Sequence, residues 1–245
     1  MHFQVSIPNT QSISRAVAEL QQQGLENIYV IEEVHTAIIG GFTHRVIDGL
    51  ADGHMELLPE TIDWEAQWAD FAPGYDGNHL KIGDMSIQLC AGSGFGDLSH
   101  PTTQMMCEAM QQVDLGDCII DLGCGSGVLG CVGVKCNVKQ FYMVDIDHDA
   151  LNHAKENMRL NAAPIDVIYD HHVQDDWLAN VDTILMNMIL PNQYSVFENC
   201  PKLQEFRGQW ITSGMLKTHE CEYLEFMNRP VTHRIEKDNW LAFIH

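Results

Sequence analysis

The sequence predicts an α/β protein in which a small α+β domain precedes a mostly parallel, doubly wound sheet of seven strands. The first observation is the alternation, after residue 100, of short apolar runs typical of buried strands with amphipathic segments typical of helices. Such alternation favours a parallel sheet with right-handed crossovers. The second observation is a β-α-β-β pattern before residue 60 with apolar positions of its own, which predicts a separate small domain.

The small domain is assigned to residues 1–60. Residues 3–7 alternate apolar and polar side chains, as a strand does. Residues 12–23 place Ile13, Ala16, Val17 and Leu20 on one helical face, and residues 27–32 and 36–42 are predicted strands. Residues 61–98 are expected to form a linker and a lid, and residues 99–245 the main domain.

Two tryptophans stand four residues apart in the linker, Trp64 and Trp68, on a predicted short helix over residues 63–74. Packing between the domains is the favoured interpretation of this pair. An aromatic pair that faces a substrate is the alternative.

The main domain begins with a predicted helix over residues 101–113, whose methionine-rich face is expected to pack in the core: Met105, Met106, Ala109 and Met110. Predicted strands follow at 118–122, 140–145, 166–169, 183–186 and 209–212, with helices at 128–135, 217–227 and from an N-cap at Asp147 to about residue 160. A closing hairpin of residues 231–235 and 240–244 turns around residues 237–239 and adds an antiparallel strand.

Composition limits the possible functions. The 245 residues carry 34 acidic and 13 basic side chains, a net charge of −21. Such a negative charge disfavours direct binding to nucleic-acid phosphates. Either a basic protein partner or a need for solubility would account for the excess of acidic residues. No apolar run is long enough to span a membrane, and no signal peptide is recognisable. The eight cysteines include no Cys-x-x-Cys pair, which predicts reduced thiols in a cytoplasmic protein and no metal site.

The segment richest in chemical information is residues 119–130, Ile-Ile-Asp-Leu-Gly-Cys-Gly-Ser-Gly-Val-Leu-Gly. An apolar strand leads into a glycine turn, and an apolar helix follows. Glycine tolerates positive φ and allows close approach of a ligand, and the first turn of the helix offers free N–H groups. Gly123, Gly125 and Gly127 are therefore expected to form the floor of a nucleotide-like cofactor site.

Two cofactors compete for this turn. The spacing Gly125-x-Gly127-x-x-Gly130, with Asp145 twenty residues after Gly125, fits a dinucleotide site. However, Asp121 stands beside the turn and would repel a pyrophosphate. S-adenosylmethionine carries no phosphate, and its ammonium and sulfonium groups suit a nearby carboxylate. The sequence therefore favours S-adenosylmethionine over NAD or FAD.

Further candidates end the later strands, because ligands of open α/β sheets bind at the carboxyl ends of strands. Asp121 is expected to receive the cofactor's ammonium and Asp145 its ribose hydroxyls; helix capping is the alternative for Asp145. Asp170 is placed to reach the adenine amino group. Asn187 is expected in the site because the apolar run after it does not resemble a polar turn.

A glycine-rich loop over residues 92–103 runs into a helix, with Pro101 near its first position and Ser99 or His100 as its N-cap. A mobile surface loop is the alternative interpretation of this segment.

These motifs together resemble the ribosomal protein L11 methyltransferase (PrmA-like) family, a group of class I methyltransferases with a Rossmann-like fold. The matching segments are the loop Phe95-Gly-Asp-Leu-Ser-His-Pro-Thr-Thr103, the glycine turn of residues 121–127, Asp145-Ile146-Asp147, Met186-Asn187-Met188, the Asp-Trp-x-x-x-Trp linker of residues 63–68 and Ser213-Gly214-Met215-Leu216. They follow the family's order over nearly the whole chain.

The resemblance implies a protein amino-group methyltransferase that uses S-adenosylmethionine and acts on a large-subunit ribosomal protein, with the small domain recognising that substrate. It implies cofactor contacts from Phe95, Cys124 and Ile146, a role for Thr102 and Thr103 at the cofactor's methionine end, and Asn187 as the residue that orients the amine.

One departure from the family pattern concerns the lid, where Asp97 and Leu98 replace a Thr-Gly pair. A noncatalytic cofactor-binding module is therefore one alternative, and a small-molecule methyltransferase is another.

Overall fold

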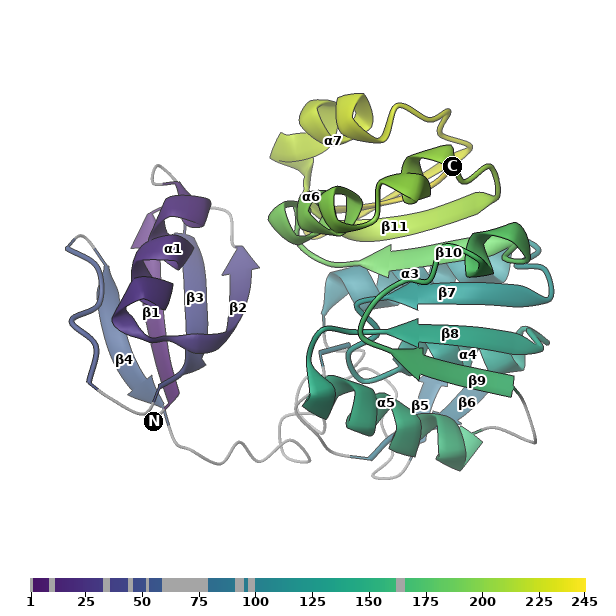
Figure 1. Ribbon diagram of the computed structural model, residues 1–245, viewed down its shortest axis with the longest axis horizontal. Helices are drawn as coiled ribbons and strands as arrows, with labels where there is room; N and C mark the ends of the chain where they lie inside the picture. Colours follow the sequence, from purple (N-terminus) through teal and green to yellow (C-terminus); the bar gives the residue numbers. More distant parts are fainter. Residues whose placement is uncertain are drawn as a thin grey trace. The chain divides into compact units, whose positions relative to one another are not determined.

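The computed structural model describes residues 2–8, 12–32, 36–43, 46–51, 53–58, 79–90, 95–96, 100–161 and 166–245 (Figure 1). The chain divides into two compact units, Met1–Asp63 and Trp64–His245. The expected Trp64–Trp68 pair and the lid residues Asp97, Leu98 and Ser99 lie outside the described residues.

The described residues of the first unit form a four-stranded antiparallel sheet with one helix. Its strands, in the order β2-β3-β1-β4, are β1 (His2–Pro8), β2 (Glu26–Glu32), β3 (Thr36–Phe42) and β4 (His54–Leu58). Helix α1 (Ile13–Gln23) confirms the helix predicted over residues 12–23. Its N-cap is Ser12, whose side chain accepts a hydrogen bond from the N–H of Arg15, and it ends at Gly24 with a φ of 97°. Leu20 of α1 and Val5 of β1 are fully buried in this unit's own core. Strand β4 was not predicted from the sequence.

The second unit contains the predicted seven-stranded sheet, in the order β12-β13-β11-β10-β7-β8-β9. Its strands are β7 (Cys118–Leu122), β8 (Gln140–Val144), β9 (Asp166–Asp170), β10 (Thr183–Asn187), β11 (Gln209–Leu216), β12 (His233–Lys237) and β13 (Trp240–Ile244). Strands β7 to β11 run parallel to one another, whereas β13 pairs antiparallel with both β11 and β12. The order reverses at β7, so ligands are expected beside the end of this strand.

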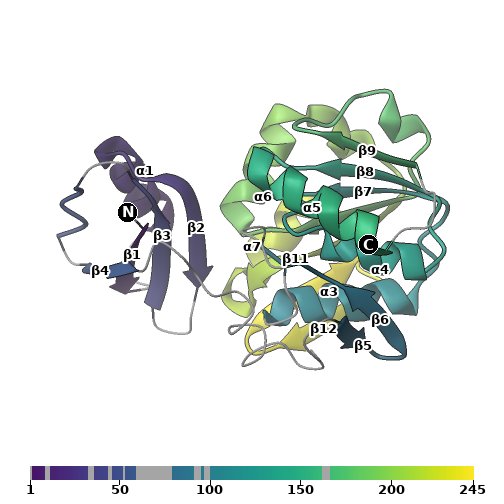
Figure 2. The same ribbon diagram turned by 90° about the horizontal axis from the view of Figure 1, so that it is seen from below.

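Helices cover both faces of the sheet (Figure 2). The helices are α3 (Pro101–Gln112), α4 (Val128–Lys135), α5 (His148–Asn161), α6 (Leu190–Asn199) and α7 (Glu220–Met227). Neighbouring residues of β7 alternate between the two cores: Ile119 packs with residues of α3, α4 and α5, whereas Ile120 packs with residues of α6 and α7. The predicted methionine-rich face of α3 is buried, as expected for core packing.

A short hairpin, β5 (His79–Ile82) and β6 (Met85–Gln88), lies within the residues expected to form the linker and lid. Leu80 and Ile87 are fully buried in the core beside α4 and α5. Part of this segment is therefore a packed element of the second unit. Its strands are only four residues long, too short for a clear hydrophobic period.

The closing hairpin turns through Asp238 and Asn239, with φ values of 50° and 66°, as a two-residue turn between right-twisted strands requires. Strand β12 begins at His233, two residues later than predicted.

Phe141 of β8 is fully buried, whereas Ile146, just after the same strand, is 85% exposed. We expect Phe141→Ala to lower the free energy of unfolding by about 3–5 kcal/mol because it leaves a cavity. Ile146→Ala should change it by less than about 0.5 kcal/mol. Urea unfolding followed by tryptophan fluorescence measures both values, and equal losses would contradict the assigned burial.

Candidate functional site

The strand ends that carry the predicted site residues meet at one edge of the sheet (Figure 1). Asp121 lies near the end of β7, and its pairing partners are Met143 of β8 and Leu185 of β10. Asp145 follows β8, and Asn187 ends β10. Because these strands are parallel and adjacent, residues far apart in the sequence become neighbours there.

The glycine turn between β7 and α4 has the backbone conformation that the sequence predicted. Gly123, Gly125 and Gly127 have φ values of 68°, 53° and 75°, in the left-handed region that favours glycine. The N–H groups of Gly123 and Cys124 donate to the Val144 carbonyl oxygen at 2.8 and 3.0 Å, which ties the turn to the end of β8.

The glycine-rich loop contacts this turn directly. The Ser126 N–H donates to the Phe95 carbonyl oxygen at 2.7 Å, and a Cβ at Gly125 would collide with the same oxygen. The Phe95 ring is 56% exposed and lies edge-on to His100, with 5.4 Å between ring centroids. Phe95 and Ile146 therefore leave apolar surface exposed, as the walls of an adenosyl site would.

The Asp145 carboxylate is held by two backbone groups. Its Oδ2 accepts from the Gly125 N–H and its Oδ1 from the Asp147 N–H, both at 3.0 Å. Burial raises the pKa of Asp145, and these two hydrogen bonds oppose that rise. The predicted capping of α5 falls to Asp147, whose side chain accepts from the Asp149 N–H at 2.9 Å. Asp145 thus supports the turn and keeps lone pairs available to a ligand.

Asp121 is the most unusual group in the site. It is 1% exposed, and neither carboxylate oxygen has a hydrogen-bond partner among the described residues. Burial, and secondarily the charge of Asp145, raises the pKa of Asp121 to about 7. A buried carboxylate without partners is costly, and a cationic ligand group would relieve that cost. The position therefore fits the ammonium of S-adenosylmethionine and disfavours a pyrophosphate.

Asn187 is buried at the end of β10, where its Nδ2 lies 3.5 Å from the Thr103 hydroxyl and its Oδ1 has no partner among the described residues. Thr103 belongs to α3, so this contact joins the helix to the site. The Thr102 side chain contacts His100 instead, with its hydroxyl 2.8 Å from Nδ1 of that ring. His100 is the observed N-cap of α3, with Pro101 in the first turn.

Asp170 ends β9, farther along the same edge, and its backbone oxygen accepts from the Asp145 N–H at 3.3 Å. Its side chain accepts from the His172 N–H and from Gln174. Nδ1 of His171, to which the sequence assigned no role, lies 3.0 Å from the Asp145 carbonyl oxygen. Asp170 is thus adjacent to Asp145, with its carboxylate already used in its own loop.

Near Asn187, the sequence analysis missed Gln193, whereas Gly214 lies in the segment of residues 213–216 that carries the resemblance. Gln193 of α6 is fully buried and donates to the carbonyl oxygens of Met188 and Ser213 at 2.7 and 3.0 Å. Gly214, with a φ of 99°, leaves no room for a Cβ beside the Met188 backbone. A glutamine four residues after Ile189 resembles an ordinary helix residue, so only tertiary packing identifies it.

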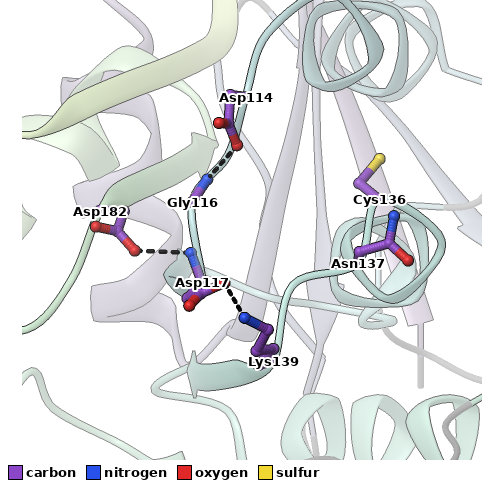
Figure 3. Close-up of a pocket in the computed structure, with 7 residues that line it drawn as sticks. All are labelled: Asp114, Gly116, Asp117, Cys136, Asn137, Lys139 and Asp182. Carbon is purple, nitrogen blue, oxygen red and sulfur yellow. Dashed lines mark hydrogen bonds and ion pairs between the residues drawn. The ribbon is translucent and has the colours of Figure 1, made fainter.

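A surface pocket of about 540 Å³ lies at the opposite edge of the sheet (Figure 3). Its carboxylates already have structural partners: Asp182 accepts from the Asp117 and Cys118 N–H groups, and Lys139 pairs with Asp117 at 2.6 Å. The pocket lies at the amino ends of β7, β8 and β10, so it is separate from the candidate site.

The fold and the residues at the strand ends define the class of this protein, an α/β fold of the methyltransferase type with a candidate site for an adenosyl cofactor. Comparison with known proteins agrees with this class. Residues 54–245 match the family model described as ribosomal protein L11 methyltransferase (PrmA). The chain belongs to this family, which confirms the resemblance, the predicted fold class and S-adenosylmethionine as the cofactor.

Individual relatives are distant. A ribosomal protein L11 methyltransferase of Anoxybacillus flavithermus is 28% identical over 182 residues, which cover 72% of this chain and 56% of the relative. One from Acetivibrio thermocellus is 27% identical over 224 residues, 85% and 70% of the two chains. With two further relatives from Thermoanaerobacter, the matched part is 64% and 57% of their length. The chain thus spans little more than half of several curated relatives.

Among solved structures, the ribosomal protein L11 methylase of Lactobacillus delbrueckii subsp. bulgaricus aligns with a TM-score of 0.54 and 22% identity. The alignment covers 73% of this chain and 90% of that one, and it shows the shared fold.

The unpartnered carboxylate of Asp121 predicts opposite effects on stability and binding. Since its folded pKa lies above the unfolded value of 3.8, the contribution of Asp121 to stability is full below about pH 4 and is lost as the pH rises through about 7. Asp121→Asn should therefore stabilise the free protein relative to the original, increasingly from about pH 5 to pH 8.

The same substitution should weaken binding of S-adenosylmethionine at about pH 8 by about 10- to 100-fold, because a charged hydrogen bond is lost. Thermal unfolding across this pH range and calorimetry measure the two effects. Unchanged affinity would show that another group receives the ammonium.

Proposed function

We propose that this protein is an S-adenosylmethionine-dependent methyltransferase that methylates an amino group of a large-subunit ribosomal protein. The observation that carries the proposal is the buried carboxylate of Asp121 beside a glycine turn, without a hydrogen-bond partner among the described residues, in a chain of the L11 methyltransferase family. A cationic, phosphate-free cofactor satisfies that carboxylate, whereas a dinucleotide does not.

The residues that would hold the cofactor follow from their positions. Asp121 would pair with the ammonium, and the free lone pairs of Asp145 would accept the ribose hydroxyls. The exposed side chains of Phe95 and Ile146 would border the adenine. Asp170, at the end of β9, would accept a hydrogen bond from the amino group of the adenine.

The glycine turn would contribute backbone surface at Gly123, Cys124, Gly125 and Gly127, where a Cβ on any of the three glycines would meet atoms closer than about 3 Å. Thr103, which touches Asn187, would border the methionine end, and Thr102 would position His100 at the start of α3.

When bound, S-adenosylmethionine would supply a methyl group on a positively charged sulfur: the C–N bond to an uncharged amine would form as the C–S bond breaks, with S-adenosylhomocysteine leaving and the amine proton passing to solvent. The Oδ1 of Asn187, which has no partner in the described part of the chain, can accept an N–H from the amine and thereby orient the amine's lone pair. Asp121 and Asn187 are buried, which limits the access of water to this part of the site.

The acceptor is assigned from charge and from family. A net charge of −21 favours association with a basic protein, as ribosomal proteins typically are, and disfavours nucleic-acid backbones. The small domain of residues 1–60 is proposed to recognise this protein. All eight cysteines are free, which fits the reducing cytoplasm. Within the described residues, no helix has the length and apolar character to cross a membrane.

The decisive experiment supplies cofactor with a labelled methyl group and a ribosomal extract from cells that lack this methyltransferase. Mass spectrometry should locate the label on an amino group of one large-subunit protein, and Asn187→Ala should reduce the turnover. Cofactor binding with no transfer would favour a noncatalytic module. Label found only on small molecules would favour a small-molecule methyltransferase.

If the acidic field steers the substrate, the association rate constant should fall as salt is added, because the screening length shrinks to about 8 Å at physiological ionic strength. Stopped-flow binding of the identified acceptor at several salt concentrations measures this. A rate constant independent of salt would assign the charge to solubility alone.

A further inference from the structure

The inward face of α5 carries three polar side chains at intervals of four residues: His153, Asn157 and Asn161. Asn157 is fully buried, and His153 is 7% exposed. Buried polar groups in a helix are unfavourable unless they are hydrogen-bonded, so their partners indicate what this face is for.

Asn157 joins two segments that are distant in the sequence. Its Oδ1 accepts from the Cys90 N–H at 2.8 Å, and its Nδ2 donates to the Ser126 carbonyl oxygen at 2.8 Å. Cys90 leads into the glycine-rich loop, and Ser126 belongs to the glycine turn. One amide group therefore connects the base of the loop with the floor of the candidate cofactor site.

A second connection closes the arrangement. The N–H of Ser126 donates to the Phe95 carbonyl oxygen of the loop at 2.7 Å. The N–H and the carbonyl oxygen of Ser126 are therefore both hydrogen-bonded, the first to the loop and the second to Asn157. Nε2 of His153 lies 2.8 Å from the Cys90 carbonyl oxygen. The chain on both sides of residues 91–94 is thus attached to α5 and to the turn.

Asn161 uses the same chemistry without reaching the turn. Its Oδ1 accepts from the Gln88 N–H at 2.8 Å, and its Nδ2 donates to the Gln88 carbonyl oxygen at 2.6 Å. Its Nδ2 also contacts the Asn157 carbonyl oxygen at 2.8 Å and the Cys131 sulfur of α4 at 3.5 Å. It anchors the end of β6 and makes no contact with the glycine turn among the hydrogen bonds of the described residues. The helix therefore contains a matched pair of asparagines, one connected to the site and one not.

We propose that Asn157 is a positioning residue for cofactor binding, which holds the glycine turn and the base of the glycine-rich loop in one fixed arrangement. The inference rests on the proposed function, because it concerns the same cofactor site. Without Asn157 the Ser126 carbonyl and the Cys90 N–H lose their buried partner. The turn and the loop then move independently, and the cofactor must order them when it binds.

The test compares Asn157→Leu with Asn161→Leu in the full chain. For Asn157→Leu we expect affinity for S-adenosylhomocysteine to fall by about 10- to 100-fold by calorimetry, and KM for the cofactor to rise with little change in kcat. Asn161→Leu should lose comparable thermal stability but keep its affinity within about threefold. If Asn157→Leu does not fold, Asn157→Asp and Asn161→Asp at about pH 8 replace the pair.

Hydrogen exchange gives a readout that needs no cofactor. In the Asn157 variant, peptides containing Cys90 and Ser126 should both exchange faster, whereas the Asn161 variant should change only the peptide around Gln88. The proposal is overturned if the Asn157 variant binds like the original protein, or if both variants lose affinity equally. If the unmodified protein itself fails to bind S-adenosylhomocysteine, the proposed function fails instead, and the exchange result still tests the connection.

Discussion

The second unit depends above all on the turn between β7 and α4. Its positive φ angles point several N–H groups away from the regular sheet, and each group needs a partner. Val144 and Asp145 at the end of β8, and Phe95 in the glycine-rich loop, provide those partners. The turn therefore stays in place only when the neighbouring strand and the loop are also folded, which makes the site a cooperative product of three segments.

The electrostatics of this edge favour function over stability. Asp121 is buried and Asp145 is partly buried, and the charge of Asp145 adds to the cost of ionising Asp121. Asp145 is compensated by backbone N–H groups, whereas Asp121 has no such compensation among the described residues. A protein that needed only stability would place an apolar residue at Asp121. In the proposed function, the pairing of this carboxylate with a cation would offset the cost of its burial, and such perturbed groups cluster at functional sites.

Local sequence signals were sufficient for elements with a strong period. The parallel strands β7, β8 and β10, helix α4 and the cap of α5 follow from apolar runs, glycines and a capping residue. The hairpin of β5 and β6 and strand β4 were missed because four or five residues with mixed polarity carry no distinct pattern. These strands are stabilised by what they pack or pair against, which a local pattern does not contain.

The sequence by itself determined the chemistry at the strand ends: the glycines of the turn, Asp121, Asp145 and Asn187 are recognisable from type and spacing, because parallel strands bring their carboxyl ends together. Tertiary structure alone decided how that chemistry is supported. Only the folded chain shows that the Asp121 oxygens lack partners among the described residues, that Gln193 holds the Met188 carbonyl and that Asn157 joins Cys90 to Ser126. Most of these contacts link segments far apart in the chain, and no short-range pattern encodes a hydrogen bond whose partner is chosen by packing.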